Sequence, residues 1–544
     1  MTRIITGTLL LLLAATAGAT VIHVPGDHAL IHDAVQAAAA GDTVQVAAGT
    51  YTDCTHETEG PGSTPACVIM KAGVTLRGAG SGQTVIDAQG LGRGIFVEGI
   101  AGVVIENLAV RGAYAEIYGA GILVRNGATG AVLRDLLITL NGDGGVVVIQ
   151  DSDASLENVA FVDNEAKQGG GLAVEEFSTA MLTGCSFVSN QAPSGGGIFI
   201  RNGCDVSING CTLESNLVNA DFGNGGGVCV QAAHCDITGT SFTQNSTRGA
   251  GGGLAYVSAA TGTVENCEFI GNVTAAGYNY GAAISCQSSA PVLRGLLLAG
   301  NAAASVGSDG GGIDIQFNPA PTVENCTLVG NSCSTAGLAG GILVQWGATP
   351  AITNCIIAGS TAGAGIGNQF AAGYTVTGCD LWDNAGGDAP GGVDGGCNFS
   401  ADPLFCNAAE GNYRIEPGSP CAAGNHPDGA CGASHVGAYA AGCGTAVGEL
   451  PAPRLTLGNM PNPFNPQTTI FFALDAPGDA VVRITDLRGR TLRTFVRHGL
   501  AADTRYELRW DGRDAQGRSL PSGVYLYRLE SGGAATSQRM SLIR

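Results

Sequence analysis

The chain has 544 residues, of which 87 are Gly and only 13% are charged. This length exceeds what one hydrophobic core usually fills, so we expect several domains or a repeat array, and the clusters of Gly between runs of Val, Ile and Leu exclude a helix-rich enzyme and a disordered chain. From Pro451 onward the chain has 13 basic and 8 acidic residues, a net charge of +5. The part before Pro451 has 12 basic and 37 acidic residues, a net charge of −25. So acidic a surface excludes nucleic acid as a partner.

Residues 1–19 are typical of a signal peptide. Arg3 supplies the positive end, Leu9–Leu13 the apolar stretch and Ala17–Ala19 a cleavage site of small residues. A membrane anchor is the alternative, but the apolar run is short for a bilayer and no later segment reaches the length of a membrane span. We therefore predict export, with no transmembrane segment after removal of the signal.

A short helix is predicted at 29–39, where the apolar residues share one helical face and Gly41 ends the helix. The end of a repeat array exposes strand edges and apolar core. We therefore expect this helix to cap the N-terminal end of such an array.

Seven cysteines lie near the two ends of the β-rich region. Cys54 and Cys67 bracket a polar loop, and the other five crowd the opposite end. Because exported proteins form disulfides, we predict end-clamping disulfides whose pairing the sequence does not determine. The candidates are Cys54, Cys67, Cys397, Cys406, Cys421, Cys431 and Cys443.

The middle of the chain contains an internal repeat with two halves. One half is a Gly cluster followed by apolar alternation, as in Gly195–Ile200, and the other is predicted to be a nine-residue strand ending in Asn, as in Leu182–Asn190. Copies of the second half start 23 to 30 residues apart. This variable period, without an amphipathic helix between the strands, indicates a coil of parallel strands. Leucine-rich repeats would show a fixed Leu–Asn pattern, and propeller blades would be longer.

Stacked coils turn equivalent positions into columns. The ninth position of the second half is Asn in nine of ten copies, with Ser360 as the exception; Asn tolerates left-handed backbone, and its amide can bond to the Asn one coil away. The fourth position is Cys in six copies and Leu, Val or Thr in the others, which indicates a small buried slot. Disulfides between neighbouring coils are the alternative, and a metal site is less favoured. The predicted ladders are Asn141, Asn164, Asn190, Asn216, Asn245, Asn272, Asn301, Asn331 and Asn384, and Cys185, Cys211, Cys267, Cys326, Cys355 and Cys379.

Several stretches resemble pectin-lyase-fold proteins. These are "IHVPGDHALIHDAVQAAAAGDTVQVAAGTYTD" (22–53), "GVTLRGAGSGQTVIDAQG" (73–90), the repeated "VENCTLVGN" type and the closing "YRIEPGSPCAAG" (413–424). The resemblance implies an all-β chain built on a right-handed parallel β-helix over 20–443. It implies no single activity, because this rod serves lyases, hydrolases, adhesins and phage tailspikes.

The tail has a different composition. "NMPNPFNPQTTIFFAL" (459–474) and "LRWDGRDAQGRSLPSGVYLYRL" (508–529) resemble the C-terminal sorting domains of type IX secretion substrates and the immunoglobulin-like domain of flagellar hook-capping proteins. The resemblance implies a linker at 444–454 and a small immunoglobulin-like β-sandwich at 455–544 that directs the chain across the outer membrane. We therefore expect a protein secreted by, or held on the surface of, a Gram-negative-type bacterium, with the outer-membrane secretion machinery as a partner.

The position just past each glycine strand is predicted to face outward and to form a stripe along the rod, flanked by aromatic residues such as Phe177 and Phe317. Amide, guanidinium and aromatic groups suit hydroxyl-rich polymers; a solvated polar ladder is the alternative. The candidates for ligand binding are Glu175, Arg201, Gln231, Gln287, Asp314, Gln316, Gln345 and Trp346.

The sequence contains no recognisable catalytic motif. The calcium-binding carboxylates with an Arg base of pectate lyases, and the clustered Asp, Gly-His-Gly and Arg-Ile-Lys of polygalacturonases, are missing. His28 and His32 have a ligand-like spacing, but Ala29 replaces the Glu of a metalloprotease motif. Glu175 and Glu176 are adjacent on a strand and face opposite ways, whereas glycoside hydrolysis needs two cooperating carboxylates.

We therefore predict a non-catalytic, adhesin-like or polysaccharide-binding rod that acts as a monomer, with a polysaccharide or cell-surface glycan as partner and no metal or cofactor. The alternative is a divergent polysaccharide lyase or glycoside hydrolase, and calcium would then be a cofactor.

Overall fold

The computed structural model describes residues 19–58, 64–115, 119, 121–275, 281–304, 310–317, 319–334, 338–370, 372–389, 392–429, 431, 434–443, 456–460, 467–474, 477–485, 490–501, 506–521, 523–531 and 534–542. The predicted signal peptide, apart from Ala19, and the predicted linker 444–454 lie outside these residues.

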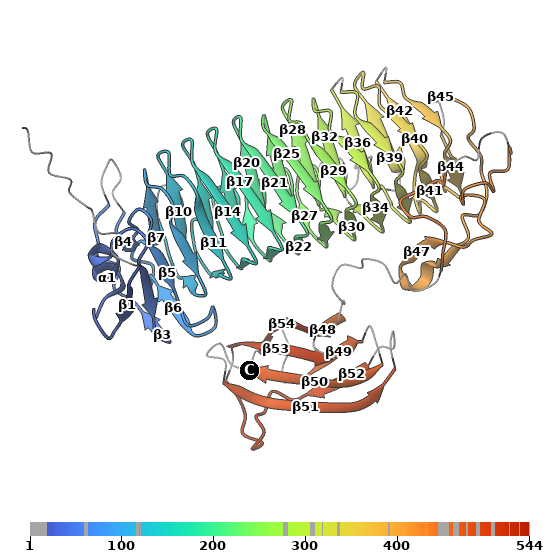
Figure 1. Cartoon of the computed structure of the whole chain (residues 1–544). Helices are drawn as coiled ribbons and strands as arrows, with labels where there is room; N and C mark the ends of the chain where they lie inside the picture. Colours follow the sequence, from blue (N-terminus) through green and yellow to red (C-terminus); the bar gives the residue numbers. More distant parts are fainter. Residues whose placement is uncertain are drawn as a thin grey trace, which may run out of the picture.

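Three long parallel sheets form a rod (Figure 1). Sheet 1 has 15 strands, from β1 (Val21–Val24) to β45 (Val393–Asp394). Sheet 2 has 13, from β3 (Gly49–Tyr51) to β44 (Asp380–Trp382), and sheet 3 has 12, from β4 (Ala66–Ile69) to β42 (Ala364–Gln369). The chain visits sheets 1, 2 and 3 in turn, so each strand pairs with its equivalent one coil away. The predicted parallel β-helix is confirmed.

The nine-residue unit is two strands, and the prediction of one continuous strand is wrong. In Leu182–Asn190, β17 (Thr179–Thr183) ends in sheet 1 and β18 (Ser186–Val188) begins in sheet 2. Between them Gly184 has a φ of 63°, and in other coils Gly, Asn or Asp takes this position with a similar φ. A left-handed residue turns the chain sharply, so the third position of the unit makes the corner between the two sheets.

The interior of the rod is filled by columns of apolar side chains that stack from coil to coil. Val174 of β16 (Leu172–Val174) lies opposite Ile200 of β20 (Ile198–Arg201), and both are fully buried. Aromatic rings stack in the same way, with 4.4 Å between the ring centroids of Phe242 and Phe269. Close packing of this kind fixes the register, because a slip by one residue would turn these side chains outward.

The asparagines form a buried hydrogen-bonded ladder. The side-chain oxygen of Asn216 accepts from the backbone N–H and the side-chain amide of Asn190, each at 3.0 Å. The amide of Asn216 donates to the carbonyl of Phe187 and to the side-chain oxygen of Asn245, each at 2.9 Å. The same bonds link Asn141 through to Asn331 along successive coils. At Ser360 the side-chain link ends, and the backbone N–H of Ser360 donates to Asn384 at 3.2 Å.

The cysteines of the fourth position are buried free thiols, so the alternative of disulfides between coils is excluded for this column. Burial raises the pKa of Cys267 to about 12. A thiol with such a pKa stays protonated at neutral pH and is a poor nucleophile. The column therefore packs the corner between sheets 1 and 2.

The N-terminal end carries one helix and one disulfide. Helix α1 spans Ile31–Ala37, which is shorter than the predicted 29–39, and it buries Ile31, Ala34 and Val35. Cys54 and Cys67 form a disulfide that closes the loop between β3 and β4.

The segment after β45 lies on the outer face of sheet 2. Residues 434–443, here called the strap, run back along this sheet. The backbone N–H of Gly437 donates to the carbonyl of Asn354 at 2.8 Å, and the Tyr439 hydroxyl lies 3.3 Å from the Glu268 carboxylate. Disulfides join Cys397 to Cys431 and Cys406 to Cys443.

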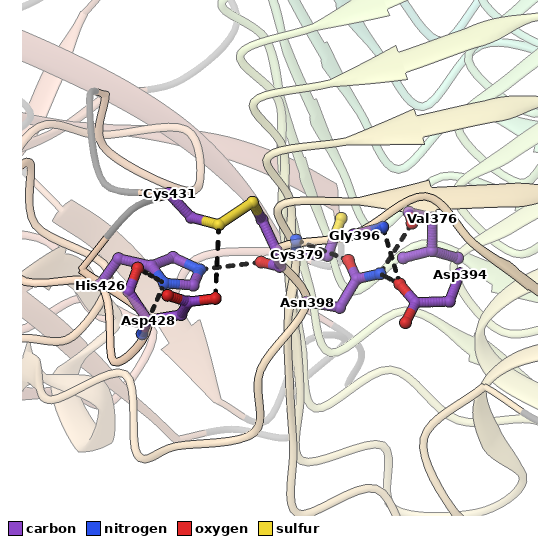
Figure 2. Close-up of a disulfide and its surroundings, with 9 residues drawn as sticks. Val376, Cys379, Asp394, Gly396, Asn398, His426, Asp428 and Cys431 are labelled. Carbon is purple, nitrogen blue, oxygen red and sulfur yellow. Dashed lines mark hydrogen bonds between the residues drawn. A yellow bond between two sulfur atoms is a disulfide. The ribbon is translucent and has the colours of Figure 1, made fainter.

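The first of these disulfides sits in a hydrogen-bonded cluster at the end of the rod (Figure 2). Nδ1 of His426 lies 3.0 Å from the backbone nitrogen and 2.9 Å from the carbonyl oxygen of Asp428, and Nε2 lies 2.8 Å from the carbonyl oxygen of Cys397. The Asn398 amide donates to the carbonyl of Val376 at 2.7 Å. These hydrogen bonds attach the segment 397–428 to the last coils of the rod.

The prediction that Cys421 joins a disulfide is wrong. Cys421 is a fully buried free thiol, and its sulfur lies 3.1 Å from a carboxylate oxygen of Asp380 on β44. Asp380 is also fully buried, and desolvation raises the pKa of this carboxyl to about 6. The Cys421 thiol therefore hydrogen-bonds a buried acid instead of forming a disulfide.

Asp380 is expected to make the stability of the rod depend on pH. Because the folded pKa of about 6 lies above the unfolded value, the protonated form is favoured by folding. Stability is gained as the pH falls from 6 to 4 and lost as it rises. Two pK units correspond to about 3 kcal/mol. Urea unfolding at pH 4, 5, 6 and 7 measures this effect. As the pH rises, the free energy of unfolding of Asp380→Asn should increase by about 3 kcal/mol relative to that of the wild type. A difference between the two proteins that stays constant with pH would contradict the raised pKa of Asp380.

Residues 456–542 contain two antiparallel sheets, β48-β49-β52 and β51-β50-β53-β54. Phe472 of β49 (Thr468–Ala473) and Trp510 of β52 (Tyr506–Trp510) share one buried core with Ile484 of β50 (Gly478–Thr485) and Tyr527 of β53 (Gly523–Ser531). The strand β48 (Thr456–Met460) completes the first sheet, and β51 (Thr491–Leu500) and β54 (Ala534–Leu542) are the edges of the second. In the part of the chain that the structure describes, no helix has the length and apolarity needed to cross a membrane.

Candidate functional site

The predicted stripe is a column along one edge of sheet 3. Arg201 lies opposite Gln231 at the end of β24 (Val228–Gln231), Gln287 of β32 (Ile284–Gln287) lies opposite Gln316 of β36 (Ile313–Gln316), and the strand pairing of β36 with β39 (Ala339–Gln345) continues the line. Gln345 lies opposite Gln369 of β42. We call this line of side chains the edge column.

Most of the edge column is less exposed than the sequence suggests. Glu175, Gln316 and Gln345 are buried, each with at most 3% of its surface exposed, so the expectation of an exposed stripe is wrong for these three. Asp314, which lies two residues before Gln316 and flanks the column, is fully buried as well. Gln231 and Gln287 are half-buried. Trp346 is 40% exposed.

The cause is a second apolar layer on the outer face of sheet 3. Phe199, Cys229, Ala255 and Val257 form a buried cluster separate from the interior of the rod. The segments that begin with glycine pack closely against this layer. For example, a Cβ added to Gly195 would lie only 2.8 Å from the Phe199 Cβ. The clustered glycines therefore allow the chain to cover this face.

The N-terminal half of the edge column consists of ion pairs. The guanidinium of Arg201 donates two hydrogen bonds to one oxygen of Glu175, at 2.6 and 3.0 Å, and lies 5.7 Å from the Phe199 ring centroid. Burial raises the pKa of Glu175 and outweighs the opposing effect of Arg201. Arg125 pairs with Glu98 at 2.7 Å. Each of these two arginines therefore has its carboxylate within the column.

The C-terminal half of the edge column has no charged residue, and the acid Asp314 lies beside it on β36. The Gln345 amide nitrogen donates to Asp314 at 3.0 Å, and the Gln287 amide donates to the Ser285 hydroxyl at 3.3 Å. The side-chain oxygens of Gln345 and Gln369 are buried and accept no hydrogen bond from the described residues. An amide oxygen in this state costs about 1–3 kcal/mol, so these two positions favour a partner that donates hydrogen bonds.

Beside this half, three aromatic side chains form what we call the aromatic ridge: Phe317, Trp346 and Phe370. Their ring centroids are 6.1 and 4.0 Å apart along successive coils, and each side chain is between 40% and 49% exposed. All three have left-handed backbone, with φ between 52° and 68°. Bulky residues rarely adopt this conformation, and strain of this kind is typical of functional sites.

Gln369 and Phe370 are absent from the sequence prediction. Their strand lacks the triple-glycine start that marks the other copies. A Gln–aromatic pair recurs at 316–317, 345–346 and 369–370, and this repeated pair would have found them.

Two histidine rings contact each other at the N-terminal end. The His32 ring stacks on His56, with 3.7 Å between the centroids, and its Nδ1 accepts from the backbone N–H of Ile69 at 3.3 Å. A hollow of 210 Å³ lies beside His32 and Asp53. Across the described ranges no group of three or more His, Cys, Asp or Glu side chains is arranged to hold a metal ion.

The family model of the right-handed β-helix region matches residues 72–226 and 170–349. These stretches overlap and together span 72–349, which is 278 of the 544 residues. The chain therefore belongs to the right-handed β-helix family. No curated protein matches it.

Solved structures with similarity include the A-module of the mannuronan C-5 epimerase AlgE4 from Azotobacter vinelandii, at 15% identity over 68% of this chain and 94% of that chain, with a TM-score of 0.37. The PL6 family alginate lyase AlyGC matches at 15% identity over 71% of this chain and 54% of that chain, with a TM-score of 0.39. Latent PorU from Porphyromonas gingivalis is 25% identical over 17% of this chain, with a TM-score of 0.15, and this chain spans only 9% of its length. All three TM-scores lie below 0.5, and the family match alone assigns the fold.

Proposed function

We propose that this protein is an exported rod that binds a glycan chain along the aromatic ridge and the adjoining amides of the edge column, without cleaving it. The aromatic ridge is the observation that carries the proposal. Three large rings occupy positions where Gly or Asn would be unstrained, and they remain half-exposed on consecutive coils. Sugars bind proteins through apolar contact with aromatic rings and hydrogen bonds from nearby polar groups.

Export is supported by the predicted signal peptide and by three disulfides, which persist in oxidising compartments. We propose that the two-sheet tail is an immunoglobulin-like sorting domain, which the outer-membrane secretion machinery would receive. Helix α1 would cap the N-terminal end of the rod. A monomer secreted by, or held on, a Gram-negative-type cell fits these features.

The non-catalytic assignment rests on the ion pairs. Glu175 is buried and bonded twice by Arg201, so this acid and this base neutralise each other. Divergent lyase or hydrolase activity is the competing function. Incubation with acidic polysaccharides, with and without calcium, would reveal it as new unsaturated or reducing ends that Arg201→Ala abolishes.

Trp346→Gly is expected to weaken glycan binding about tenfold while leaving the rod folded. Gly relieves the left-handed strain, about 1–2 kcal/mol. This gain offsets part of the loss of the half-buried ring and of its two stacking contacts, each of which is worth about 0.5–1.5 kcal/mol beyond burial. Affinity electrophoresis in gels that contain soluble polysaccharides should show a loss of about tenfold, close to 1.4 kcal/mol.

The matched control is Trp382→Ala, which removes a tryptophan of similar exposure (37%) from sheet 2. The control should bind as the wild type does. Equal losses in the two variants, or binding by Trp346→Gly, would contradict the assignment of the aromatic ridge.

A further inference from the structure

The charges around the aromatic ridge point to the class of glycan that it binds. We infer that the ligand is a neutral, hydroxyl-rich polysaccharide rather than one that carries carboxylate or sulfate groups. This inference rests on the proposed function, and it concerns the amides Gln345 and Gln369 and the acid Asp314 beside the rings.

The region of the ridge has few cations. Between Asn202 and Tyr413 the chain has two basic residues, Arg248 and Arg294. Arg248 pairs with Asp221 at 3.0 Å, and Arg294 lies on sheet 1, where it pairs with Glu324. Recognition of sugar carboxylates or sulfates relies on Arg or Lys donors. In the N-terminal half, Arg125 and Arg201 are already bonded to Glu98 and Glu175.

A buried carboxylate also disfavours an anionic ligand. Asp314 is fully buried, and it is hydrogen-bonded by the Gln345 amide directly before Trp346. A carboxyl group in this place accepts hydrogen bonds, whereas a sugar carboxylate or sulfate is bound by Arg or Lys donors. The rod as a whole carries −25 before Pro451, which adds a long-range repulsion.

The two acceptors without a donor would be satisfied by sugar hydroxyl groups once their amides turn outward, because both oxygens are buried in the structure. Gln345 is 1% exposed and its side-chain oxygen has no donor among the described residues, and the Gln369 oxygen one coil away is in the same state. Each precedes an aromatic residue of the ridge. The coil spacing of about 4.8 Å is close to the length of one hexose in an extended chain, so successive sugars can meet successive coils.

The test is affinity electrophoresis of the full chain against neutral glucomannan, xyloglucan and dextran and against polygalacturonate and alginate, at low and at moderate salt. We expect at least one neutral polysaccharide to retard the protein equally at both salt concentrations, and neither acidic one to do so. Gln345→Leu and, as a less buried second variant, Gln369→Leu should each weaken this retardation about tenfold, the loss of a hydrogen-bonded acceptor.

The experiment distinguishes a failure of the neutral ligand class from a failure of the proposed glycan binding. Salt-sensitive retardation by polygalacturonate or alginate, lost in Trp346→Gly, would overturn the neutral class but keep the glycan-binding ridge. Retardation by none of the five would overturn the proposed function itself. Unchanged binding in both glutamine variants would show that the amides do not contribute.

Discussion

Replacing Asn216 by Ala is expected to lower the free energy of unfolding by about 4 kcal/mol. The substitution leaves the buried N–H of Asn190 and the carbonyl of Phe187 without their side-chain partners. Each such buried group costs about 1–3 kcal/mol. It also divides the ladder, because the amide of Asn190 loses its bond to the next coil. Urea unfolding followed by circular dichroism would measure the change.

Asn209 offers a matched control. It is half-buried at the end of β21 (Asp205–Asn209), in sheet 1 of the same coil, and lies outside the ladder. Asn209→Ala should change stability by less than about 0.5 kcal/mol, as surface substitutions usually do. A loss at Asn216 no larger than the loss at Asn209 would mean that the ladder does not hold the coils together.

Gly226→Ala is expected to destabilise the rod by about 3 kcal/mol or more, the upper range for overpacking. A Cβ at this position would lie 2.3 Å from the carbonyl oxygen of Gly252 and less than 3 Å from backbone atoms of Ser246. All of these atoms belong to the next coil, and backbone cannot move aside as a side chain can. Gly226 thus fits the close approach of these two coils, whereas the equivalent place two coils on is held by Ala282.

Gly210→Ala separates this steric effect from backbone strain. Gly210 has a φ of 58°, and a Cβ there would have no atom within 4 Å. This substitution should cost only the left-handed penalty of about 1–2 kcal/mol. Thermal unfolding of the two variants compares the effects, and equal losses would show that the space around Gly226 is not limiting.

The fold can be predicted from the sequence because the residues of each column recur at fixed positions of the repeat. Asn recurs at a position where it can bond to its own equivalent, and Cys alternates with Leu and Val at a position that can only be a buried slot. The corner at Gly184 was missed because a nine-residue run such as Leu182–Asn190 has the alternation of a single strand. The signal was present, since Gly, Asn or Asp stands at the third place of every copy.

The burial of the edge column could not be predicted in the same way. Which face of sheet 3 is covered depends on how the glycine-led segments fold over it, and the repeat records that these glycines recur without indicating the face that they cover. The same reason explains Cys421. Its partner, Asp380, lies 41 residues away in sequence, and the packing of the segment after β45 on sheet 2 brings the two together.

The sequence predicts which candidate residues lie next to one another, but not all of their neighbours. Gln316, Gln345 and Trp346 are among the ligand-binding candidates that the sequence indicates, and the structure places Gln369 and Phe370 beside Gln345 and Trp346. The weaker glycine signal of the last coils conceals these two residues. Glu175 and Arg201 lie together, as expected for neighbouring coils, but their mutual hydrogen bonds make them a structural pair.

The central claim is that equivalent residues of successive coils lie in line, since the ladder and the ridge both require it. Distances between spin labels on introduced cysteines at Thr183, Arg294 and Thr353 test it most directly, because strand pairing places these three residues in one column of sheet 1, and the native free thiols are buried. At about 4.8 Å per coil, we predict about 19 Å from 183 to 294, four coils on, and about 29 Å from 183 to 353, six coils on. Equal distances, or a shorter one to 353, would contradict the stacked rod.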